Sequence, residues 1–322
     1  MNPITYIFLR CANKIVCRLQ FLPDEIFLKL RYFCEMGQWP NLKNPKLFQE
    51  KIQWLKLHNR KPEYTMMVDK YAVKSYVADI IGDDMITPTI GVWNTVDEIN
   101  FDSLPEQFVL KTTHGGGNGG VVICTDKASF DIQTAKIKLK RSMRDDIYSI
   151  YREWPYKDVP KRIIAEEYIG DGKNDLTDYK VYCFNGEPRY IQVIKDRNTC
   201  ETIDFFDTEW NHQPFWGLNP ISRPSGLSIS RPSGLSLMLS ASKSIAEKLT
   251  FARIDFYQLE DGIRFGEITF FPASGLGTFT PAEWNLKLGG MINLPPPYNP
   301  VNLLIKYSDC CAGNLFTINK AA

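Results

Sequence analysis

The sequence is poor in the residues and patterns that mark several common classes of protein. Its three histidines and eight cysteines form no CxxC pair and no zinc-like group, so we expect reduced thiols in a cytosolic protein. No apolar run reaches the length of about 18–20 residues that a membrane-spanning helix needs. The net charge of +1 indicates no strong attraction to nucleic acid. A 44% hydrophobic and 23% charged composition is instead typical of a globular protein.

Basic residues are concentrated near the N-terminus. Residues 1–74 contain 13 Lys/Arg but 6 Asp/Glu, which indicates an acidic or membrane-surface partner or, alternatively, a solvated face. Within this part, residues 1–22 place apolar side chains at helical spacing but interrupt them with Arg10, Lys14 and Arg18, unlike a secretory signal. We predict a basic amphipathic helix that lies either on an anionic membrane or on the protein surface.

Hydrophobic spacing predicts helices first and strands later. Helical periodicity recurs over residues 24–80, whereas short apolar runs separated by turn residues dominate from residue 85 onward. Charged helical residues 129–150 and a helix at 238–250 interrupt the strands. Tight hairpin turns are predicted at Asn185-Gly186 and Asp261-Gly262. The predicted class is α+β, with two lobes and a cleft between them.

Residues 222–237 repeat an octapeptide, SRPSGLSI followed by SRPSGLSL. Two copies are too few for a solenoid, and the Pro, Ser and Gly content favours a surface loop. We interpret the repeat as a duplication inside a tolerant loop. The tail, rich in proline at 295–300, is expected to run over the surface.

A glycine-rich loop follows an apolar strand that ends in a lysine. The strand 108–111 ends at Lys111, and residues 114–120 read HGGGNGG. Glycine lets the backbone approach a ligand closely and direct N–H groups at phosphate oxygens, while the lysine adds positive charge. The loop lacks the P-loop pattern GxxxxGK[ST], so it predicts a hairpin folded over phosphates. An ordinary glycine turn is the alternative.

Two acids, Asp255 and Glu267, occur on strands separated by the turn at 261–262. A hairpin there would place both carboxylates on one face. Facing carboxylates repel unless a cation lies between them, and magnesium prefers such oxygen ligands together with phosphate oxygens. A salt bridge from either acid to Arg253 or Arg264 is the structural alternative.

Taken together, residues 65–290 resemble the ATP-grasp superfamily, whose members hold ATP between two α+β lobes. Within it, several segments are similar to the TupA-like ATP-grasp group of polysaccharide biosynthesis proteins. The strings that carry this similarity are NPKLFQEKIQWLKLHN, VDKYAVKSYV, VLKTTHGGG, DYKVYCFNGEP, ARIDFY and GEITFFPASG.

The resemblance implies a role for each candidate residue. The implied nucleotide-binding residues are Lys70, Lys111, His114, Gly115, Gly116, Gly117, Asn118, Gly119, Glu166, Glu167, Ile169 and Asp178. The implied metal ligands are Asp255, Glu267 and Thr269. The candidate catalytic residues are Arg253 and Lys180. In this scheme the Glu166 carboxylate binds the adenine amino group, the backbone of residues 167 and 169 hydrogen-bonds to the edge of the adenine ring, and Asp178 binds the ribose. Most ATP-grasp enzymes have asparagine where Thr269 stands, so a second magnesium ion would be held more weakly or through water.

The implied reaction is the ATP- and Mg²⁺-dependent joining of a carboxylate to an amine through an acyl phosphate. The implied acceptor is a uronic acid of an acidic surface glycan or of a lipid-linked sugar precursor, with an amino acid or amino sugar as amine, in the cytoplasm or at the inner face of the membrane. A sugar kinase, a glycosyltransferase and a non-catalytic nucleotide-binding protein remain as alternatives.

The predicted organisation has four parts. Residues 1–64 form a basic helical region, and 65–165 form the small lobe with the glycine loop. Residues 166–295 form the large lobe with the magnesium-binding acids, and 296–322 form the tail.

Overall fold

The computed structural model describes residues 3–170, 176–196, 200–218, 223–226 and 228–298. The helices are α1 (Pro3–Val16), α2 (Asp24–Met36), α3 (Phe48–His58), α4 (Glu63–Val68), α5 (Ala72–Ile81), α6 (Ile132–Ser142), α7 (Ile147–Tyr151), α8 (Leu235–Ala246) and α9 (Glu283–Met291). The strands are β1 (Thr89–Trp93), β2 (Phe108–Thr112), β3 (Val121–Cys124), β4 (Ile163–Glu167), β5 (Asp178–Phe184), β6 (Glu187–Lys195), β7 (Thr202–Asp207), β8 (Trp216–Gly217), β9 (Phe251–Leu259), β10 (Gly262–Thr269) and β11 (Phe279–Thr280). The α+β class is therefore confirmed.

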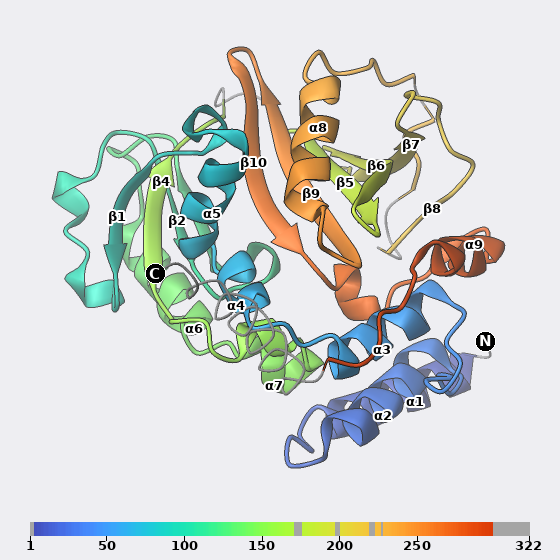
Figure 1. The fold of residues 1–322 in the computed structure, drawn as a ribbon. Coiled ribbons are helices and arrows are strands. Elements are labelled where there is room, and N and C mark those ends of the chain that lie inside the picture. The colour runs from blue at the N-terminus through green and yellow to red at the C-terminus, as the bar shows by residue number, and fades with distance from the viewer. Residues whose placement is uncertain (1–2, 171–175, 197–199, 219–222, 227, 299–322) are drawn as a thin grey trace, which may run out of the picture.

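Two antiparallel sheets form the body of the protein (Figure 1). The first sheet has the strand order β1-β4-β2-β3, and the second has the order β10-β9-β5-β6-β7. Strands β8 and β11 make a further short pair. Helix α5 packs on α8 and helix α4 packs on β10, so these two helices border the second sheet where the first sheet approaches it.

The predicted hairpins are present, and local backbone chemistry explains the first of them. Asn185 and Gly186 have φ values of 52° and 85°, the left-handed region that asparagine and glycine tolerate best. They join β5 to β6. Gly262 pairs with Leu259, so the β9–β10 hairpin is present but its turn is at Glu260 and Asp261, one residue earlier than predicted.

Strand alternation separates a packed face from a polar face in the second sheet. Cys183 lies against α8, where its thiol is close to the Ser242 carbonyl oxygen, and Ile254 lies on the same packed face. Because successive side chains of a strand point to opposite faces, Lys180 and Asp255 project from the other face. The first sheet follows the same rule, with a core of its own that includes Leu139 of α6.

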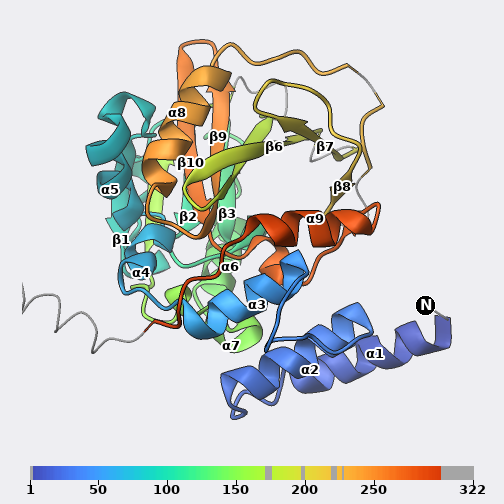
Figure 2. The same ribbon diagram turned by 45° about the vertical axis from the view of Figure 1, so that its right-hand side comes forward.

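Helix α3 belongs to the core of the second sheet although it precedes both sheets in the chain. Phe48, Ile52 and Leu55 are buried in the same cluster as the β5 and β9 side chains. By contrast, α1 and α2 form a hairpin with a small core of Val16, Phe27 and Cys34. Figure 2 shows this hairpin below the sheets, at the edge of the molecule. The predicted division into four parts, with its boundary after residue 64, stays a prediction.

The interpretation of residues 222–237 as a surface loop is wrong for the last three residues of the second octapeptide. Helix α8 begins at Leu235, which lies inside that copy and is fully buried, rather than at residue 238. The described part of the first copy lies beside β7, where the Arg223 carbonyl accepts a hydrogen bond of 2.9 Å from the Ile203 N–H. The helical spacing of apolar residues extends back into the second copy, and burial of Leu235 stabilises it as helix. The tail from residue 299, with Cys310 and Cys311, lies outside the described residues.

Over the described ranges, none of the helices has both the length and the apolar character needed to cross a membrane.

Candidate functional site

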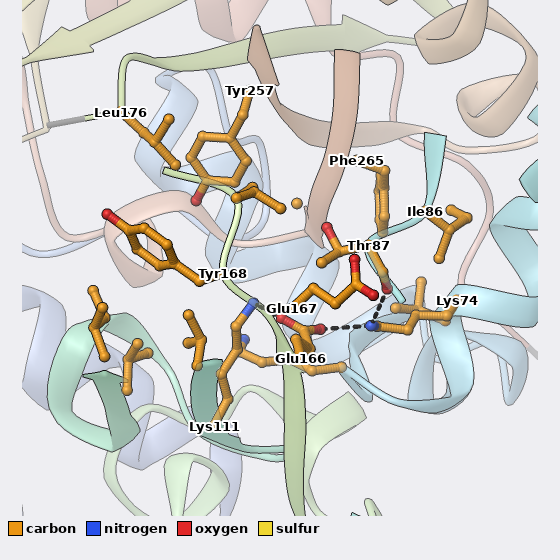
Figure 3. Close-up of a pocket in the computed structure, with 17 residues that line it drawn as sticks. Lys74, Ile86, Thr87, Lys111, Glu166, Glu167, Tyr168, Leu176, Tyr257 and Phe265 are labelled. Carbon is orange, nitrogen blue, oxygen red and sulfur yellow. Dashed lines mark hydrogen bonds and ion pairs between the residues drawn. The ribbon is translucent and has the colours of Figure 1, made fainter. Parts of the chain in front are cut away.

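A pocket lies between the two sheets and the N-terminal end of α5 (Figure 3). One wall comes from β2, β3 and β4 of the first sheet, and the facing wall comes from β9 and β10. Its apolar lining consists of Val73, Ile86, Val109, Val121, Ile123, Ile169, Leu176 and Phe265. An apolar cleft with a few convergent charged groups is typical of a site for a small organic ligand.

The main charged group inside this pocket is Glu166, whose side chain is 6% exposed. Its two carboxylate oxygens bind two ammonium groups: Lys74 lies 2.7 Å from Oε1, and Lys111 contacts Oε2. Lys74 also donates to the Thr87 carbonyl oxygen at 2.6 Å, and both Lys74 bonds are drawn in Figure 3. Burial alone would raise the pKa of Glu166, but the charges of Lys111 and Lys74 outweigh it and lower that pKa.

The residues predicted to bind adenine, Glu166, Glu167 and Ile169, all lie at the pocket. Glu167 and Ile169 line the pocket beside Glu166. The carboxylate of Glu166 is already bound by two lysines, so a base amino group would have to share its oxygens with them. Contact of Glu166 with adenine stays a prediction.

Lys74 is a pocket residue that the sequence analysis missed. It lies on α5, four residues after Lys70, which precedes the helix, and both side chains line the pocket. That spacing was visible in the sequence. Burial lowers the pKa of Lys74, while the Glu166 carboxylate opposes this shift.

Lys70 is positioned by the start of α5. The Asp69 carboxylate accepts a hydrogen bond of 2.9 Å from the Tyr71 N–H, as a capping side chain does, and Arg162 holds its other oxygen at 2.6 Å. The Lys70 N–H in turn donates to the Thr113 carbonyl oxygen at 3.0 Å. The segment that carries Lys70 is thus bonded directly to the end of the strand that carries Lys111.

Asp255 and Glu267 share one face of the β9–β10 hairpin, as the sequence predicts. The pairing shifts between Phe265 and Ile268, a bulge that sets Glu267 near Asp255. Arg253 lies between the two acids. Its Nε and Nη2 donate to Asp255 at 2.7 and 2.8 Å, and Nη2 also reaches Glu267 at 3.2 Å.

Further cations surround these two acids. Lys70 donates to Glu267 Oε2 at 3.0 Å, and Lys180 binds Asp255 Oδ2 while it lies 3.4 Å from Asp178. Burial would raise the pKa of Glu267, but Lys70 and Arg253 lower it well below the usual range of a carboxyl. Burial opposes the charge on Arg253, but Asp255 outweighs it and raises the guanidinium pKa. Both groups therefore stay ionised across the physiological pH range.

We define this set as the charged cluster. Its members are Lys70, Asp178, Lys180, Arg253, Asp255, Glu267 and Thr269, whose hydroxyl lies 3.1 Å from Arg253 Nη2. The salt bridges to Arg253 that we held open as an alternative are thus present, whereas Arg264 pairs with Asp261 instead. Lys70 belongs both to the pocket and to the charged cluster, so the two lie side by side.

The donor atoms of the charged cluster fit magnesium held jointly with phosphate. Among the described residues, no three His, Cys, Asp or Glu side chains are grouped to hold a metal ion by themselves. Asp255 and Glu267 supply two carboxylates, and Thr269 adds a hydroxyl nearby. Magnesium accepts such oxygen ligands and completes its shell with water and phosphate oxygens.

The glycine loop is the hairpin that the sequence predicts. Lys111 pairs with Val121 across β2 and β3, and Gly117–Gly120 form a single 3₁₀ turn between them. Gly117 has φ of 62°, a conformation that glycine adopts without strain. His114 is buried, and burial lowers its pKa, so we expect a neutral imidazole that brings no charge to the loop. Phosphate binding by Gly115–Gly119 stays a prediction.

Gly120→Ala is expected to weaken nucleotide binding by about tenfold or more. A Cβ at this position would lie well inside contact distance of the Thr112 and Ser142 hydroxyl oxygens, which are 2.9 Å apart and support the loop. Gly290→Ala is the matched control, because a Cβ there meets no atom and Gly290 lies on α9, outside the loop. Isothermal titration with ATP and Mg²⁺ compares the three proteins. Equal affinities for both variants would contradict a phosphate-binding role of the loop.

Comparison with known proteins gives the following similarities. No curated protein matches the chain. The D-alanine–D-alanine ligase structure from Bacillus anthracis is 19% identical, with a TM-score of 0.38 over 65% of this chain and 58% of that chain. The corresponding Helicobacter pylori ligase is 17% identical, with a TM-score of 0.42 over 77% and 69%. The ATP-grasp ligase PsnB in complex with a precursor variant, Mg and ADP is 12% identical, with a TM-score of 0.35 over 65% and 52%.

The chain thus spans less than two thirds of the length of the first of these ligases. The sequence profile of the family described as TupA-like ATPgrasp matches residues 50–293, which include both sheets, the pocket and the charged cluster. Because this match covers about three quarters of the sequence, the chain belongs to the TupA-like ATP-grasp family.

Proposed function

We propose that this protein is an ATP- and Mg²⁺-dependent ligase that joins a carboxylate to an amine through an acyl phosphate. The observation that carries the proposal is the charged cluster beside the apolar pocket. Lys70, Lys180 and Arg253 gather three positive charges around Asp255 and Glu267. Membership of the ATP-grasp family supports the choice of nucleotide.

The nucleotide base would enter the apolar pocket, and its phosphates would extend toward Lys70 and the charged cluster. Phosphoryl transfer needs positioning and charge neutralisation more than covalent work by the protein. Asp255 and Glu267 would hold magnesium, which neutralises phosphate charge when bound. Lys70, Lys111 and Arg253 would then bind and orient the phosphate oxygens.

The reaction needs no reactant other than ATP, the carboxylate and the amine. A substrate carboxylate oxygen attacks the γ-phosphorus, the bond to the ADP oxygen breaks, and an acyl phosphate forms. The amine nitrogen then attacks the acyl carbon, phosphate leaves, and the nitrogen loses a proton to give an amide. Arg253, which already contacts three oxygen-bearing side chains, would stabilise the negative charge of the acyl phosphate.

The proposed carboxylate is a uronic acid of an acidic surface glycan or of its lipid-linked precursor, and the proposed amine is an amino acid or amino sugar. The similarity of the segments around the site to polysaccharide biosynthesis proteins supports this choice. We place the reaction in the cytoplasm, where ATP is available.

The test incubates the purified protein with ATP, Mg²⁺, uronic-acid glycans and a panel of amino acids, and follows ADP and phosphate. Release of both only when carboxylate and amine are present together supports the ligase. ADP with a stable phosphorylated sugar and no need for an amine would identify a kinase instead. Absence of ATP binding would overturn the proposal.

A further inference from the structure

The hairpin of α1 and α2 exposes an unusual share of apolar side chains. Five of the twelve large hydrophobic residues that are exposed in the described structure fall within residues 8–39. They are Phe8, Ile15, Phe21, Ile26 and Trp39, and Phe21 and Phe8 are 81% and 68% exposed. Single exposed apolar residues are ordinary on a protein surface, whereas a concentration of them marks an interaction site.

Helix α1 carries distinct stripes along its length. Leu9 and Val16, seven residues apart, are buried, and Val16 belongs to the small core shared with α2. Phe8 and Ile15, also seven residues apart, form a neighbouring stripe that faces outward. The packed stripe accounts for the contact with α2. The outward stripe has no covering element among the described residues.

The charge carried by α1 and by the turn that follows it has a single sign. Residues 1–23 contain no Asp or Glu, while Arg10, Lys14 and Arg18 are exposed. Arg10 lies 3.9 Å from Glu35 of α2, which is a weak surface contact. The open side of α1 therefore combines an apolar stripe with basic residues, the pattern of a helix that lies in a membrane interface.

The hairpin is also placed where a flat surface can reach it. Figure 2 shows α1 and α2 at the edge of the molecule, with α3 between them and the sheets. Trp39, just after α2, stacks on Phe33 with ring centroids 4.6 Å apart and is itself exposed. Tryptophan is enriched at the level of lipid headgroups.

We propose that the α1–α2 hairpin binds the surface of an anionic phospholipid bilayer. Phe8 and Ile15 enter the boundary between headgroups and acyl chains, and Lys14 and Arg18 contact lipid phosphates. The association is peripheral. This inference does not depend on the proposed ligase reaction, because it uses residues outside the pocket and the charged cluster.

The test is co-sedimentation of the full-length protein with phosphatidylcholine vesicles that contain or lack 30% phosphatidylglycerol, a composition chosen for the assay. We expect binding to the anionic vesicles that weakens as salt is raised, because the electrostatic part is screened. Phe8→Ser with Ile15→Ser should lower the partition coefficient at least about tenfold, since two apolar side chains no longer enter the bilayer. Because both side chains are already exposed, the unfolding temperature should stay close to that of the unchanged protein.

The matched control is Ile137→Ser with Leu286→Ser. Ile137 is 69% exposed on α6, which is also a basic helix, so this pair tests whether any exposed apolar residue near lysines is sufficient. The control should bind vesicles as the unchanged protein does. Three results would overturn the proposal: no vesicle binding, equal loss in the control, or self-association through the hairpin without lipid binding. Analytical ultracentrifugation of the same variants detects the last of these.

Discussion

Glu267→Gln is expected to abolish turnover, with a loss on the order of 10³-fold, while the fold is retained. The pKa of Glu267 lies well below its usual range, because Lys70 and Arg253 outweigh the effect of burial, so this side chain is a full negative charge in the folded protein. Glutamine keeps the shape and one oxygen acceptor for the two cations. It removes the charge that would hold magnesium in the nucleotide complex.

Glu260→Gln is the matched control, since Glu260 is exposed near the tip of the same β9–β10 hairpin. ADP release and ATP affinity are measured for both variants, and circular dichroism checks the fold. The control should keep full activity. If Glu267→Gln retained more than about a tenth of the turnover, the assignment of Glu267 to the reaction would be wrong.

Lys56→Met is expected to cost about 3 kcal/mol or more of unfolding free energy. Lys56 lies on α3, is completely buried, and donates to the carbonyl oxygens of Tyr151 at 2.9 Å and of Ser274 at 2.8 Å. It also donates to the Ser274 hydroxyl at 2.7 Å. Methionine fills similar space but leaves these acceptors unsatisfied. Burial also lowers the pKa of Lys56 and raises that of the nearby Glu153, each against the charge of the other, so the substitution removes one member of this pair.

The same substitution also affects a strained segment. Ala273 and Ser274 have φ values of 46° and 55°, which is unfavourable for residues other than glycine, and this segment directly follows the strand of Glu267. The bonds from Lys56 help to hold it. We therefore expect Lys56→Met to lower turnover even at temperatures where the protein remains folded.

Lys51→Met, on the same helix, serves as the comparison. Lys51 is only partly buried and makes one bond, of 2.7 Å, to the Ile292 carbonyl oxygen, so the expected cost is about 1 kcal/mol. Urea unfolding followed by tryptophan fluorescence measures both values. Equal stability of the two variants would show that the buried ammonium of Lys56 does not stabilise the fold.

Much of the fold follows from local rules that operate within a few residues. Turn residues such as Asn185 and Gly186 specify a hairpin because they tolerate positive φ, and alternation separates the packed face from the polar face of β5 and β9. These predictions needed no knowledge of distant residues. Helix α9 was not predicted, and α8 begins earlier than predicted, because packing rather than local composition decided both.

In the repeated octapeptide, too, packing partners decide which local structure forms. Ser225 of the first copy donates its N–H to the buried Asp204 carboxylate at 3.0 Å, beside β7. Gly234 and Leu235 of the second copy begin a helix instead, with the Gly234 N–H bonded to Gln258. The equivalent glycines differ accordingly, since Gly226 has φ of 69° while Gly234, at the start of α8, has φ of −82°.

The sequence by itself determined the glycine hairpin, most of the order of the elements and most of the main charged residues, but not helix α9 or Lys74. Only the tertiary structure decided which charges neutralise each other. Lys74 and Lys111 both bind Glu166, and Lys70 binds Glu267, because elements distant in the chain meet there. Turn chemistry and strand alternation act over a few residues and can be read locally. Ion pairing depends on distances across the whole fold and on burial, which lowers the local dielectric constant and strengthens each pair.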